Sequence, residues 1–165
     1  MNDQAVAGTV ENELAAVYVE IMWLARRTNV RPSVARAWYT HARSEKLKRH
    51  VRRFTGQVSR AALEANAVCR LEHFKRIQTT LTQLVKKHLV NNLDDPADFV
   101  RTVLDYEQVH IVTLSENYAA MKAKGDYAIA GIELVDWRLI PTEKRSVLWR
   151  KMLYGKVANA KEFAL

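Results

Sequence analysis

The most distinctive chemical feature of the sequence is a group of closely spaced basic residues between positions 26 and 60. This segment holds eleven Lys and Arg residues and one acidic residue, Glu45. Clustered cations attract polyanions, and Lys and Arg neutralise the phosphates of nucleic acids. We therefore predict contacts with the phosphates of DNA or RNA from five of these side chains: Arg43, Lys46, Arg49, Arg52 and Arg53.

The charge of the rest of the chain allows a second interpretation of this basic segment. The whole protein carries a formal net charge of +8, yet residues 91–137 hold nine acidic and three basic residues. The alternative to nucleic-acid binding is a solvated basic helix face balanced by this acidic stretch. Trp38 adds to the ambiguity, because a ring beside cations can stack on an unpaired base or can seal an interface with the helix that carries Trp23.

Arg36 and His41 form a candidate pair of a different kind. The segment Arg36-Ala-Trp-Tyr-Thr-His41 resembles the active-site motif of the helical HEPN ribonucleases. The resemblance covers these six residues. It implies that Arg36 stabilises a phosphate while His41 takes part in proton transfer, which gives RNA cleavage without a metal.

Other catalytic chemistries have no matching pattern in the chain. The five glycines never take the spacing of a phosphate-binding loop. Cys69 is the single cysteine, which excludes zinc sites built on several cysteines. Glu107 and His110 have the Glu-x-x-His spacing of di-iron bundles, but the second pair and the further glutamates that such a site needs are missing. We predict no cofactor, no metal and no catalytic residue outside the ribonuclease alternative.

The elements that position these residues are predicted from apolar side chains at intervals of three and four. This spacing predicts three long helices, over residues 9–27, 33 to about 57, and 59 to about 90. The second helix carries the cations on the side opposite its apolar residues. The third helix has a heptad-like apolar stripe over residues 63–88, which offers a surface for homo-oligomerisation.

A smaller section follows the three helices. Residues 109–112 are a β-branched run that predicts a strand, and Thr113 and Glu116 have the spacing of a capping box for the next helix. Residues 131–135 give a second apolar alternation. Strand, helix and strand would form one small parallel unit, and irregular helix is the alternative for this region.

These observations predict a mainly α-helical bundle of three long N-terminal helices with a smaller C-terminal section that holds up to two short strands. One domain is expected over residues 1–165, divided into a long-helix core over 1–92 and a section over 93–165. No segment is long and apolar enough for a membrane span, and one unpaired cysteine suits the cytoplasm.

The function that this reading favours is non-enzymatic association with DNA or RNA. The alternatives are a protein-interaction or homo-oligomerisation module and, third, a metal-independent ribonuclease similar to the HEPN family.

Overall fold

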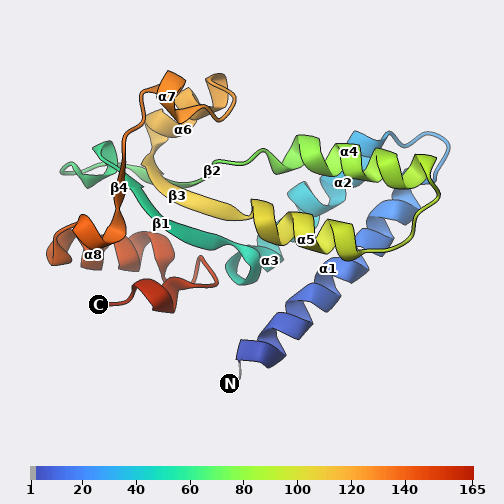
Figure 1. Cartoon of the computed structure of the whole chain (residues 1–165), viewed down its shortest axis with the longest axis horizontal. Helices are drawn as coiled ribbons and strands as arrows, with labels where there is room; N and C mark the ends of the chain where they lie inside the picture. Colours follow the sequence, from blue (N-terminus) through green and yellow to red (C-terminus); the bar gives the residue numbers. More distant parts are fainter. Residues whose placement is uncertain (1–2) are drawn as a thin grey trace. The chain divides into compact units, whose positions relative to one another are not determined.

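The computed structural model describes the backbone of residues 3–165 and the side chains of residues 9–165 (Figure 1). The chain forms two compact units, each made from two separate stretches. One unit comprises Met1–Val51 and Arg76–Tyr106, and we call it the helical unit. The other comprises Arg52–Lys75 and Glu107–Leu165 and contains a four-stranded sheet, so we call it the sheet unit. The fold is therefore mixed α/β, and the predicted mainly α-helical bundle is wrong.

The helical unit consists of helices and one π-helical turn. In chain order they are α1 (Asp3–Ala25), α2 (Pro32–Ala37), the π-helical turn η1 (Trp38–Arg43), α3 (Ser44–Val51), α4 (Ile77–Val90) and α5 (Ala97–Tyr106).

The core of the helical unit forms along the apolar stripe of α1, as the sequence predicts. Leu14, Val17 and Ile21 are fully buried, because residues at intervals of three and four share one face of a helix. They pack with the buried residues of α2, α4 and α5 in one cluster. The ring of Phe99 on α5 lies 5.8 Å from the ring of Tyr39, in an edge-to-face arrangement that aromatic pairs prefer.

The sheet unit contains four strands and the short helices that cover them. The strands are β1 (Arg53–Ser59), β2 (Cys69–His73), β3 (Gln108–Thr113) and β4 (Leu134–Asp136). The α-helices are α6 (Leu114–Lys122), α7 (Tyr127–Ala130) and α8 (Thr142–Leu148). The remaining turns are η2 (Ala61–Leu63), η3 (Trp137–Leu139), the π-helical η4 (Trp149–Leu153) and η5 (Ala160–Phe163).

The strands lie in the order β2-β3-β1-β4, with β1 and β3 parallel at the centre and both outer pairs antiparallel. Val109 and Ile111 of β3 pack in the apolar cluster that includes α8, η4 and η5, whereas Val112 packs with α6 and α7. Successive side chains of a strand point to opposite faces. The central strand is therefore buried on both faces, and Figure 1 shows α6 and α7 on the side of the sheet opposite α8.

The predicted third helix over residues 59–90 is wrong over more than half of its length. The region forms η2, β2 and the loops around them, and only α4 (Ile77–Val90) is helical as expected. The apolar stripe over 63–88 is divided between the two units, so it is no continuous helix face for homo-oligomerisation. The second predicted helix likewise ends at Val51, and Arg53 begins a strand.

The C-terminal predictions have mixed outcomes. The strand over 109–112 is confirmed within β3, and the capping box is confirmed because Glu116 N–H donates to the Thr113 hydroxyl at 3.2 Å. The small parallel unit is wrong, since β4 pairs antiparallel with β1 and not with β3. In the described part of the chain, no helix is both long and apolar enough to cross a membrane.

We predict that Asn159→Ala destabilises the protein by about 2 kcal/mol or more. The buried Asn159 amide accepts from Phe54 N–H and donates to Phe54 C=O, both at 2.9 Å. Its removal leaves buried backbone groups without partners, and each such group costs about 1–3 kcal/mol. Urea unfolding followed by circular dichroism measures the change, and exposed Lys161→Ala is the control, within about 0.5 kcal/mol of the wild type. Equal stability of the two variants would contradict this account.

Candidate functional site

Two of the predicted phosphate contacts lie on α3 of the helical unit. Lys46 and Arg49 are three residues apart, so they are neighbours on one face of the helix, and both are exposed. Neither has a carboxylate partner among the residues described. The Arg49 Nε–H donates instead to Nε2 of His50 at 3.0 Å. These two cations are available to an external anion.

Arg43 has a different environment from Lys46 and Arg49. Its guanidinium lies 3.7 Å from a carboxylate oxygen of Glu13 and 3.7 Å from one of Glu20, both on α1. About a third of the side chain is exposed. These two carboxylates balance its charge, so Arg43 contributes less than an unpaired cation to the attraction of a polyanion.

Arg52 and Arg53, at the start of β1, belong to the sheet unit and are paired there. Arg52 Nε lies 3.9 Å from Oε2 of Glu107, and only 13% of the Arg52 side chain is exposed. The same carboxylate oxygen is 2.6 Å from Nε2 of His73. Arg53 donates to Glu162 at 2.8 Å. The five predicted residues therefore divide between the two units, and the structure brings only Arg43, Lys46 and Arg49 onto one continuous helical segment.

The helical unit also carries two exposed tryptophans. Trp23 on α1 is 58% exposed, and the Arg27 guanidinium lies 4.0 Å from the centre of its ring. Trp38 in η1 is 39% exposed, and its Nε1–H donates to Glu20 at 2.5 Å. Trp38 thus contacts the first helix, as one interpretation of the sequence expects, but the contact leaves much of the side chain in water.

Glu20 on α1 contacts two residues of the π-helical turn η1, which leads directly into α3. It binds both Trp38 and Arg43, and Trp23 follows it by three residues on α1. Lys46 follows Arg43 by three residues. We group the exposed aromatic and cationic side chains of these segments under the name cationic aromatic face: Trp23, Arg27, Trp38, Lys46 and Arg49.

Arg36 and His41 share no hydrogen bond in the described structure. Arg36 donates to the hydroxyl of Thr82 on α4 at 3.2 Å and to that of Thr40 at 3.1 Å, and burial lowers its pKa. His41 is exposed in η1. A π-helical turn brings residues five apart closer to one face than an α-helix does. The Arg36 side chain is nevertheless directed to α4, and the ribonuclease alternative stays a prediction.

A network of buried polar side chains lies on the α6 and α7 side of the sheet. His110 Nδ1 is 2.5 Å from the Thr55 hydroxyl, and the His110 ring stacks on Phe74 with centroids 4.7 Å apart. Tyr127 donates to the neighbouring Glu72 at 2.7 Å, and burial together with Glu72 raises the Tyr127 pKa. Burial lowers the pKa of His110 to about 4. Each polar group here has a partner within the fold, as a structural network requires.

The geometry gives no support for metal binding by Glu107 and His110, despite their Glu-x-x-His spacing. Glu107 precedes β3 and binds His73, whereas His110 lies within β3 and contacts Thr55. No cluster of three or more His, Cys, Asp or Glu within the described residues is arranged to hold a metal ion.

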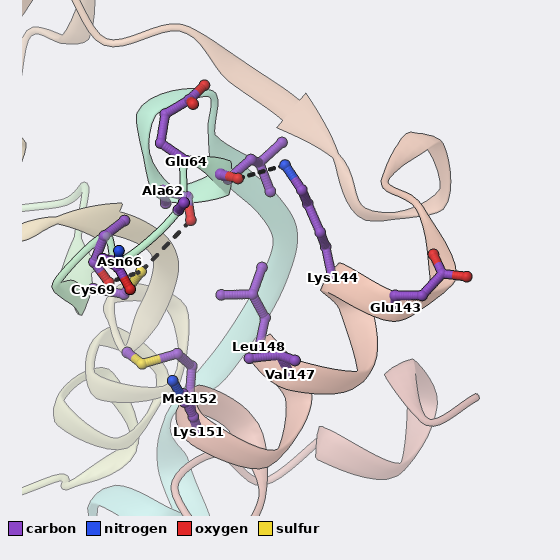
Figure 2. Close-up of a pocket in the computed structure, with 13 residues that line it drawn as sticks. Ala62, Glu64, Asn66, Cys69, Glu143, Lys144, Val147, Leu148, Lys151 and Met152 are labelled. Atoms are coloured by element: carbon purple, nitrogen blue, oxygen red, sulfur yellow. Dashed lines mark hydrogen bonds between the residues drawn. The ribbon is translucent and has the colours of Figure 1, made fainter.

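A cavity of about 560 Å³ opens between η2, the loop that follows it, and α8 with η4 (Figure 2). Ala62, Leu148 and Met152 contribute apolar surface, and Cys69 and Lys151 also line it. All of these residues belong to the sheet unit. This cavity was not predictable from the sequence, because its two walls come from segments that are far apart along the chain.

The comparisons with protein-family models, curated proteins and solved structures found no match for this chain. The function of the protein is therefore inferred from the residues and geometry described above.

We predict that His110 makes the protein less stable as the pH falls from 6.5 to about 4. The folded protein holds His110 neutral with a pKa of about 4, whereas the unfolded chain binds a proton near pH 6.5. The unfolded state therefore binds more protons in this window, and protonation removes up to about 3 kcal/mol of stability. Urea unfolding at several pH values should show a shallower dependence for His110→Asn than for wild type. Exposed His41→Asn is the control and should follow the wild type; parallel curves for His110→Asn would contradict the assignment.

Proposed function

We propose that the protein binds single-stranded nucleic acid through the cationic aromatic face of its helical unit. The observation that supports this most strongly is that two exposed tryptophans, one with Arg27 over its ring, lie in the same unit as Lys46 and Arg49, which have no carboxylate partners in the described chain. Single-strand binding proteins combine cations that follow the backbone with aromatic rings on which bases stack. The cationic aromatic face offers both groups of contacts within one unit.

The cations supply the attraction to phosphate. Lys46 and Arg49 extend from adjacent turns of α3, so they can contact successive phosphates of one strand. Arg43 lies behind them against α1 and has its own carboxylates. We assign the phosphate contacts of the helical unit to Lys46 and Arg49, with Arg43 as the residue that joins η1 to α1.

The tryptophans supply a preference for unpaired bases. Every base has a flat π-surface, so stacking on Trp23 or Trp38 needs no particular sequence. In a duplex these surfaces are covered by neighbouring bases. The face is therefore expected to bind single strands of RNA or DNA more tightly than duplex. We place this activity in the cytoplasm, because the free Cys69 suits a reducing compartment.

We expect the double variant Lys46→Ala and Arg49→Ala to bind a short fluorescein-labelled single strand at least about tenfold more weakly at low salt. Each lost phosphate contact on a single strand lowers the slope of log K against log salt by about 0.7. Fluorescence anisotropy over a salt series measures both effects. The matched control is Arg60→Ala with Arg138→Ala, since those arginines already pair with Glu133 and Asp136.

Two outcomes of that titration would contradict the proposal. Equal losses in both double variants would show that only the net charge matters, and no binding by the wild type at micromolar protein would exclude the function. The same RNA on a denaturing gel tests the ribonuclease alternative, which requires cleavage that His41→Ala abolishes.

We expect Trp23→Ala and Trp38→Ala to weaken single-strand binding by about 1–3 kcal/mol each while leaving the salt slope unchanged, because stacking involves no phosphate. Duplex binding should change little. Tyr154→Ala is the control, since Tyr154 is an aromatic residue of the sheet unit that is 67% exposed. Equal effects on single strands and duplex would show that the tryptophans do not contact bases.

A further inference from the structure

The cavity of the sheet unit has the size and lining of a small-molecule site. Its volume of about 560 Å³ falls within the usual range for ligand pockets, about 300–1,000 Å³. One wall comes from η2 and the loop that leads to β2, and the other comes from α8 and η4. Cys69, Leu148 and Met152 give this cavity a largely apolar floor (Figure 2). Such a surface favours a ligand with an apolar body.

Lys151 places a positive charge beside that floor. Burial raises the pKa of the Cys69 thiol, and the positive charge of Lys151 opposes that rise. No carboxylate within ion-pair distance of Lys151 is found in the described residues. The Lys144 ammonium, at the other wall, is held by the carbonyl oxygen of Leu63 at 2.6 Å. Lys151 is thus the cation of this cavity that lacks an internal acceptor.

The acidic residues of the lining lie at its rim. Glu64 and Glu143 are both exposed, and Figure 2 shows their carboxylates pointing away from Cys69 and Met152. Lys151 is also exposed, and it supplies the cationic group of the lining that is not held by an acceptor among the described residues. A site with an apolar floor and one unpaired cation is complementary to a ligand that is apolar along most of its length and ends in an anion.

We propose that this cavity binds an apolar organic acid, with the hydrocarbon body against the floor and the carboxylate on Lys151. The proposal is independent of nucleic-acid binding, because all the residues that carry it belong to the sheet unit. A charge-assisted hydrogen bond from an ammonium to a carboxylate is stronger than a neutral one. The acid group therefore supplies the specificity, and the apolar body supplies the area removed from water.

Isothermal titration of the full chain with decanoate, and separately with 1-decanol, tests the proposal. Decanoate should bind saturably at one site per chain, and decanol at least about tenfold more weakly, because it cannot form the charged contact. Lys151→Met should reduce decanoate affinity by a similar factor and leave decanol unchanged. Lys161→Met is the matched control, since it removes an exposed lysine of the same unit that does not line the cavity.

A second variant tests the location of the bound acid. Val147 lines the cavity and is 48% exposed, so Val147→Phe should narrow the cavity, weaken decanoate binding and retain the thermal unfolding midpoint. Undiminished decanoate binding by Val147→Phe would place the acid elsewhere and overturn the proposal. The proposal also fails if decanoate gives no saturable heat, or if decanol and decanoate bind equally.

Discussion

The sheet unit depends on the buried carboxylate of Glu107. The chain leaves this unit after β2 and returns to it at Glu107, so its strands come from two separate stretches. A buried carboxylate must find cations or donors, and here it meets His73 at the end of β2 and Arg52 before β1. The Glu107 carbonyl oxygen also accepts from Arg53 N–H at 2.8 Å. One residue thus fixes the ends of the three adjacent strands and so determines where their register begins.

Ion pairing also determines which cations remain available to a ligand. In the sheet unit, Arg53, Arg60 and Arg138 each have a carboxylate within hydrogen-bond distance. Exposed pairs contribute little stability, but they neutralise the local field that would attract a polyanion. The net charge of +8 is therefore a poor guide to an interface. Lys46 and Arg49 lie three residues apart on α3, and neither has a carboxylate partner among the described residues.

The sequence predicted elements whose signal is local and missed those that need distant partners. The apolar residues of α1 recur at intervals of three and four, and the capping box at Thr113 spans only four residues. Both features were therefore predictable from the sequence. Phe54 and Val58 are four residues apart, so their side chains lie on one side whether the segment is a helix or a strand. Their strand exists through pairing with β3, and Gly56, at a φ of +83°, accompanies the shift of register between them. The spacing of apolar residues within the segment gives no sign of this pairing with a distant strand.

The candidate nucleic-acid interface was only partly predictable from the sequence, as the position of Trp23 shows. A helical wheel places Trp23 about 200° from Ile21, on the side away from the core, although tryptophan is usually largely buried. The structure follows the wheel, since Leu14, Val17 and Ile21 already complete the buried face of α1. The core therefore does not need this ring, and an apolar surface left in water beside cations suits contact with a partner. Only the three-dimensional contacts of Glu20 bring Trp38 and Arg43 of η1 against α1.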